Sequence, residues 1–72
     1  MNDAEYKLLV RAHDEAVDAV MAAKFTKHRM TSGQSPTVAE AEKLRGHLTG
    51  ALCAAQEFEN RVRGYPAPKL GP

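Results

Sequence analysis

Two series of mainly apolar residues, spaced alternately three and four positions apart, constrain the fold of this chain most. The first series is Tyr6, Leu9, His13, Ala16, Val20 and Ala23. The second series is Ala41, Leu44, Leu48, Ala51, Ala55, Phe58 and Val62. Heptad-like spacing puts each series on one face of an α-helix and is typical of helices that pack side by side. The pattern therefore predicts two amphipathic helices.

Capping signals give the expected bounds of the two helices, about 3–29 and 36–63. Asn2 is a candidate N-cap for the first helix, and two acids in its first turn suit the helix dipole. The second helix has two overlapping start signals, a proline at position 36 and a capping box from Thr37 to Glu40. Gly64 is the expected stop, because glycine readily takes the left-handed conformation that ends a helix.

The segment between the two helices is short and contains Gly33, which can adopt a positive φ angle. Two helices of similar length joined by so short a turn must run antiparallel. Residues 1–64 are therefore expected to form a helical hairpin. The Pro/Gly-rich residues 65–72 are expected to be a disordered tail.

A chain of 72 residues with one cysteine cannot close an intrachain disulfide. Two helices alone cannot enclose a core, and short chains without disulfides or metals often gain stability by oligomerising. The expected fold is therefore all-α, a hairpin assembled into a homodimeric four-helix bundle. Its expected oligomer core comprises Tyr6, Leu9, His13, Val20, Leu44, Leu48 and Phe58.

Charge and hydropathy exclude several classes of protein. Ten Lys and Arg against nine Asp and Glu give a net charge of +1, too balanced for a protein that coats nucleic acid. No run approaches the roughly 20 apolar residues of a membrane span. The amino-terminal residues lack the pattern of a signal peptide, and a free cysteine suits a reducing compartment. A cytoplasmic location is therefore expected.

Small residues in the second helix suggest an interaction surface. Glycine in a helix costs about 1 kcal/mol relative to alanine, and Gly-x-x-x-Gly spacing lets another backbone approach closely. We expect this patch to lie on the side of the helix away from the Leu44/Leu48 stripe. The candidate partner-binding residues are Gly46, Gly50, Cys53 and Ala54. An equally simple explanation is that a solvent-exposed helix face tolerates them.

A basic group lies near the turn. Residues 21–37 carry three formal positive charges and no acid, whereas residues 1–20 carry five acids and two bases. Cations beside a helix N-terminus suit a phosphate or another anion. The candidate anion-binding or ligand-binding residues are Lys24, Lys27, His28, Arg29 and Thr37. Cations at the end of the first helix would also be explained by the helix dipole alone.

Catalytic chemistry has little support in the sequence. None of the three histidines has a nucleophile at a recognisable spacing, and Cys53 lacks an activating motif. We therefore expect no catalytic residue, no metal site and no cofactor. The expected function is a small interaction or regulatory protein that binds or occludes a larger protein. The alternative is an oligomer that binds a nucleotide or nucleic acid through the basic turn.

Overall fold

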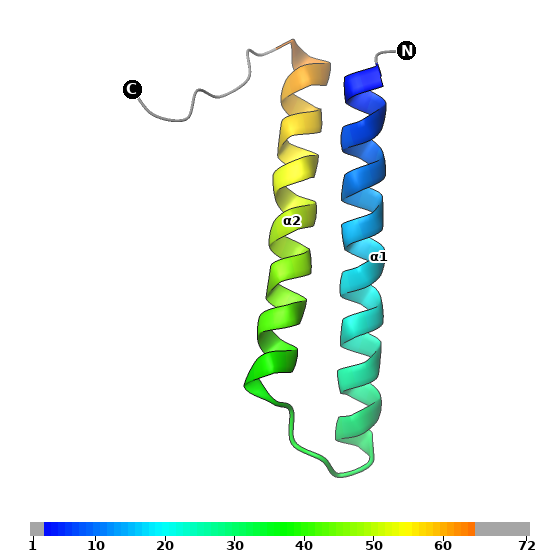
Figure 1. Cartoon of the computed structure of the whole chain (residues 1–72), viewed down its shortest axis with the longest axis vertical. Helices are drawn as coiled ribbons and strands as arrows, with labels where there is room; N and C mark the ends of the chain where they lie inside the picture. The colour runs from blue at the N-terminus through cyan, green and yellow to red at the C-terminus, as the bar shows by residue number, and fades with distance from the viewer. Residues whose placement is uncertain (1–2, 65–72) are drawn as a thin grey trace, which may run out of the picture.

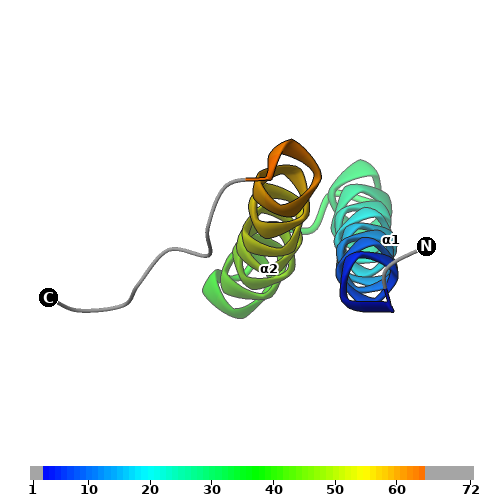
Figure 2. The same ribbon diagram turned by 90° about the horizontal axis from the view of Figure 1, so that it is seen from above.

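Two antiparallel helices make up the part of the chain that the structure describes. The computed structural model describes residues 3–64, with α1 at Asp3–Thr31 and α2 at Val38–Arg63. The helices lie side by side in a single layer, and the turn closes one end (Figures 1 and 2). The predicted all-helical hairpin is confirmed. The expected N-cap Asn2 and the tail 65–72 lie outside the described residues.

The first helix ends two residues later than predicted. Gly33 has a φ angle of 88°, and its N–H donates to the carbonyl of Met30 at 3.0 Å. The N–H of Gln34 donates to the carbonyl of Arg29 at 3.1 Å. These two bonds form a Schellman motif, which satisfies the last carbonyls of the helix. The end of α1 is therefore set by the glycine.

Of the two start signals for the second helix, the capping box is the one that operates. The N–H of Glu40 donates to the Thr37 hydroxyl oxygen at 3.1 Å, and the N–H of Thr37 donates to the Glu40 carboxylate at 2.9 Å. Pro36 lies outside the helix, so the predicted start at 36 was early. The predicted stop at Gly64 is confirmed by its left-handed φ angle of 81°.

The helices contact each other along stripes with an unbroken three-four spacing, but most of these residues were not in the predicted series. The buried and half-buried residues that follow this spacing are Leu8, Ala12, Glu15, Ala19, Ala22, Thr26 and Arg29 of α1, with Glu40, Leu44, His47, Ala51, Ala54 and Phe58 of α2. Gly50 of α2 is also half-buried and adjoins this stripe beside Glu15. Only Leu44, Ala51 and Phe58 were predicted. Most of the others precede a predicted residue by one position, a rotation of about 100° around the helix axis.

Small side chains occupy the centre of this contact. Ala19 and Ala54 are the only buried residues within 3–64, at 2% and 3% exposure. Alanine lets helix axes approach closely but removes little apolar area from water, because the gain scales with buried area. The contact between α1 and α2 therefore sets their spacing without providing a substantial hydrophobic core.

Most of the large apolar side chains lie outside the contact. Within residues 3–64 those that are exposed are Tyr6, Leu9, Val10, Val17, Val20, Met21, Phe25, Met30, Val38, Leu48, Leu52 and Val62. Neither helix of this part of the chain combines the length and hydropathy required to cross a bilayer. Isolated exposed apolar residues are ordinary, but contiguous apolar patches mark interaction surfaces. Their arrangement on the hairpin is therefore the main functional clue.

Candidate functional site

One broad side of the hairpin carries apolar residues from both helices. In an antiparallel pair of right-handed helices, the residue directly after each contact residue points to the same side of the pair on both helices. A shallow groove supports this placement, since it joins Ala23 and Met30 of α1 to Leu44 of α2. A second hollow continues from Leu44 past Leu48 to Leu52. We call the apolar residues of this surface the apolar face; they are Leu9, Ala16, Val20, Ala23, Met30, Ala41, Leu44, Leu48, Leu52 and Ala55. Lys27 and Arg45 also line the two hollows.

Much of both predicted series therefore lies on one side of the hairpin. Leu9, Val20 and Leu48 are 49%, 65% and 52% exposed, so they are available for contact with another molecule. His13 is also exposed, and its Nδ1 lies 3.1 Å from Asp14 Oδ1. Two further members of the expected oligomer core, Leu44 and Phe58, are half-buried against α1.

A second apolar strip runs along the side of α1 that is turned away from α2. Tyr6, Val10, Val17 and Met21 share this side because they are spaced by four or seven positions. We call these four residues the outer ridge. A hollow at one end is lined by Tyr6 and Val10 together with the charged Lys7, Arg11 and Asp14. A hollow at the other end is lined by Met21 and Phe25 together with the cationic Lys24 and with His28.

The four residues predicted to bind a partner do not share one outward face. Ala54 is buried against α1, and Gly50 is half-buried beside Glu15. Gly46 and Cys53 are exposed. The expectation that all four face away from the first helix is therefore wrong. The face was assigned from the predicted stripe, and the rotation of the real contact brings Gly50 and Ala54 inward.

The basic turn is partly neutralised by residues of the hairpin itself. Arg29 forms an ion pair with Glu40, and its Nε donates to Gln34 Oε1 at 2.8 Å. The Thr37 hydroxyl caps α2 and lies 3.1 Å from the same Glu40 carboxylate. Of the five candidate anion-binding residues, Arg29 and Thr37 contact Glu40, and Lys24, Lys27 and His28 are exposed. Glu40 thus already supplies an anion at the N-terminus of α2, where a phosphate was expected.

Glu40 connects the two helices near the turn. Its carboxylate also accepts a hydrogen bond from the Thr26 hydroxyl of α1 at 3.4 Å. The hydrogen bond from Arg29, and then the N–H of Thr37, lower the pKa of Glu40 from 4.5 to about 2. Both donors favour the ionised form, so folding and ionisation of this group are coupled.

Glu40→Gln is expected to lower Tm at pH 7 but not at pH 2. A carboxylate with a depressed folded-state pKa stabilises the fold fully above about pH 4.5 and loses this contribution as the pH falls toward 2. Thermal melts of both proteins between pH 7 and pH 2 measure the gap. Glu42→Gln is the matched control, because Glu42 is exposed on the same helix. A gap that stays constant over this range would contradict the coupling.

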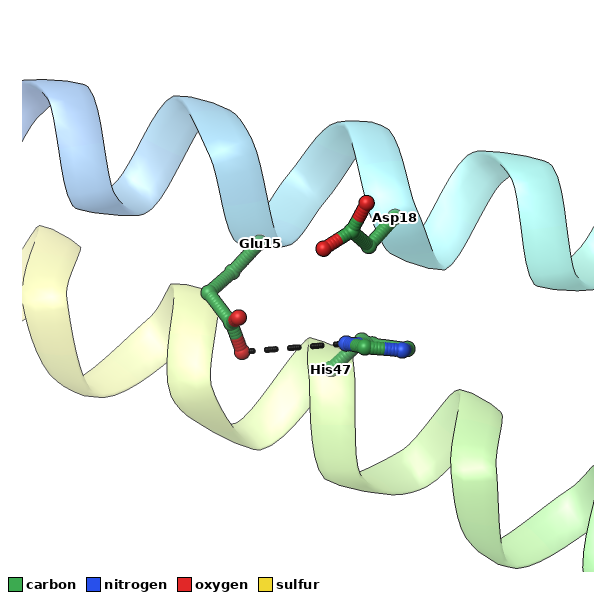
Figure 3. Close-up of side chains that lie close together, drawn as sticks. All are labelled: Glu15, Asp18 and His47. Atoms are coloured by element: carbon green, nitrogen blue, oxygen red, sulfur yellow. Dashed lines mark ion pairs between the residues drawn. The ribbon is translucent and has the colours of Figure 1, made fainter.

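The opposite broad side of the hairpin is polar and brings three ionisable side chains together. Glu15 and Asp18 lie one turn apart on α1, and His47 faces them from α2 (Figure 3). His47 Nδ1 lies 3.8 Å from Glu15 Oε2, and the side chains are 24% and 33% exposed. One ligand atom from each of the three residues lies within 4.8 Å of the other two. This spacing and donor set resemble the requirements of a metal site.

Gly50 makes room for this arrangement. A Cβ atom on Gly50 would collide with the Glu15 carboxylate and would lie 3.2 Å from Glu15 Cδ. The bare backbone at position 50 therefore lets the Glu15 side chain lie across α2 toward His47. This contact explains why a glycine occupies position 50. No such explanation applies to Gly46, because a Cβ there would meet nothing within 4 Å.

Gly46→Ala is expected to stabilise the hairpin by about 1 kcal/mol, since alanine is the better helix former and the position is open. For a domain of this size the rise in Tm would be about 4–8 °C, measured by circular dichroism. A fall in Tm would show that the helix backbone at position 46 is not in the open environment that the structure gives it.

The expectation of no metal site overlooked the three-residue cluster. Hairpin closure around residues 32–37 already places Glu15 and Asp18 at the level of the middle of the second helix. His47 lies in that range, but the assumed rotation of both helices left all three residues off the shared contact. The i, i+3 pair of acids was the available signal.

Comparison with protein-family models, with curated proteins and with solved structures found no match to this chain.

Proposed function

We propose that this chain is a non-enzymatic interaction protein that acts as a homodimer and binds a larger protein. The observation that carries the proposal is that small apolar residues are buried while large apolar residues are exposed. Two alanines are buried within residues 3–64, while Leu48, Leu52 and Val20 are each more than half exposed. A second helical layer on the apolar face would supply the core that the hairpin lacks.

A second copy of the chain is the proposed occupant of the apolar face. A helix of 29 residues is about 43 Å long, and helix axes pack 8–10 Å apart. A face two helices wide therefore offers about 800 Å² per chain, which is the size of a standard stable interface. Two such hairpins, paired face to face, form a four-helix bundle with its core along the three-four stripes.

The outer ridge is the proposed binding surface for the larger protein. It lies on the side of α1 away from α2, so the proposed dimer leaves it exposed. Lys24 and His28 border the apolar hollow of Met21 and Phe25. This combination favours an amphipathic helix with acidic residues beside its apolar stripe, since such a partner matches both features. The proposed role of the dimer is to bind that helix and thereby regulate the larger protein to which the helix belongs.

The proposed cellular location is the cytoplasm. The single cysteine, Cys53, is free and exposed on α2. A reducing compartment keeps such a thiol from forming intermolecular disulfides.

The solution mass tests the homodimer. Light scattering after size exclusion is expected to give about twice the chain mass of 7.9 kDa, both at low salt and at 1 M NaCl. Apolar burial is not screened by salt, whereas contacts between exposed charges are. A folded monomer at both salt concentrations would overturn the homodimer.

Site-specific photocrosslinking tests the partner surface. A crosslinking residue at position 17, on the outer ridge, is expected to capture one protein that position 46, on the polar side, does not capture. Lys24→Glu is expected to abolish this adduct because it repels the acidic flank. Equal capture from both positions, capture that is insensitive to Lys24→Glu, or no capture from position 17 would overturn the proposed surface.

A further inference from the structure

We propose that Glu15, Asp18 and His47 form a binding site for one divalent transition-metal ion, of which Zn²⁺ is the representative. The ligands come from facing helices, two from α1 and one from α2 (Figure 3). Metal sites in helical bundles are commonly built in this way, from side chains that project between neighbouring helices. The site lies on the polar side of the hairpin, so it is independent of the apolar face and of the proposed dimer.

The donor set selects the class of ion. One imidazole nitrogen and two carboxylate oxygens suit zinc, which binds nitrogen and oxygen ligands in a tetrahedral site and can keep water in the fourth position. The two carboxylates also balance the charge of a divalent ion. Mg²⁺ and Ca²⁺ prefer six or more oxygen ligands, so an imidazole gives them no advantage.

The distances require only a small adjustment. In a tetrahedral site, two ligand atoms that each lie about 2.1 Å from the ion are about 3.4 Å apart. His47 Nδ1 and Glu15 Oε2 are 3.8 Å apart, so they must approach each other by about 0.4 Å to share an ion. The largest separation in the cluster is within 4.8 Å. Asp18 is exposed, so its side chain can rotate toward the ion without disturbing any packed residue.

Gly50 is a positioning residue for this site. Because a Cβ at position 50 would collide with the Glu15 carboxylate, Gly50→Ala must turn that flexible side chain away from its present place. Alanine also favours the helix, so the variant is expected to stay folded. Gly50→Ala should therefore weaken metal binding while the helix content is unchanged. Gly46→Ala is the matched control, because a Cβ there meets nothing.

The experiment titrates Zn²⁺ into the metal-stripped full chain by calorimetry, in a Cys53→Ser background that removes the free thiol. The expected result is one Zn²⁺ per chain and a rise in Tm of about 10–20 °C at a zinc concentration 100-fold above Kd. Mg²⁺ at the same concentration is expected to leave Tm unchanged. Binding of Co²⁺ to the same site should give visible absorption bands, which should disappear when Zn²⁺ displaces the Co²⁺.

The variants decide whether these three residues are the ligands. His47→Gln and Glu15→Gln are each expected to weaken Zn²⁺ binding at least tenfold, since loss of an outer-shell partner alone costs about that much. His13→Gln is the matched control: it removes an exposed histidine that also lies beside an aspartate, Asp14. An equal loss in His13→Gln, or undiminished binding in His47→Gln, would overturn the site.

Discussion

Leu48→Lys is expected to dissociate the proposed dimer into folded monomers of 7.9 kDa. Leu48 is 52% exposed on the hairpin and lies between Leu44 and Leu52 in the hollow on α2. In a face-to-face dimer its side chain is buried against the second copy. The substitution removes that burial from both chains and places two cations in the same apolar interface.

The size of this effect follows from apolar burial. A leucine contributes about 1.5–3 kcal/mol when it passes from full exposure to full burial, and Leu48 is already about half-buried in the hairpin. The two copies together therefore contribute about 1.5–3 kcal/mol to the dimer. A loss of this size raises Kd by about 10- to 10²-fold. Burial of two lysine ammonium groups adds to the loss, because a charge without a partner is costly inside an interface.

Val17→Lys is the matched control for the dimer. Val17 is 41% exposed on the outer ridge, so the same kind of substitution there should leave the dimer mass unchanged. Sedimentation equilibrium of the wild type and both variants, over a range of protein concentrations, measures the change in Kd. If Leu48→Lys stays dimeric and Val17→Lys becomes monomeric, the subunits pair through α1 and not through the apolar face.

The sequence was sufficient to predict the hairpin because its signals are local. The capping box at Thr37 and the glycines at positions 33 and 64 act within one helical turn, and each specifies one backbone conformation. The bounds of both helices were therefore predicted to within two residues. Three-four spacing also predicted correctly that each helix has a continuous contact stripe.

The rotation of the helices could not be predicted from the same spacing, because neighbouring stripes have the same period. The larger side chains favoured the stripe with Leu9 and Val20, whereas the observed contact uses Ala19 and other small residues. Small residues allow close helix axes and leave the larger apolar residues exposed. This choice depends on tertiary packing, which local propensity does not encode.

The candidate metal site was missed for the same reason. Glu15 and His47 are charged or polar residues within the contact stripes, where only apolar residues were sought. Their proximity depends on the rotation of both helices at once. Gly50 was recognised as unusual in a helix, but its explanation, the Glu15 side chain that lies against it, becomes visible only in three dimensions.

Ala54→Leu is expected to destabilise the hairpin strongly. Ala54 is 3% exposed in the contact between α1 and α2, so three added carbon atoms have no space. Overpacking of this kind typically costs about 1–3 kcal/mol. Small domains have only a few kcal/mol of stability when no disulfide or metal supports them, so the loss here is a large share of the total.

The same substitution at an exposed alanine is the control, because it measures the effect of changing alanine to leucine where the side chain packs against nothing. Ala39→Leu adds the same atoms in the first turn of α2, where the side chain is exposed, and is expected to change stability by less than about 0.5 kcal/mol. Urea unfolding followed by circular dichroism gives the free energy of unfolding of each variant. If Ala54→Leu were as stable as Ala39→Leu, α1 and α2 would not be in close contact at this alanine. The small-residue contact, on which the apolar face and the Glu15–His47 pair both depend, would then be wrong.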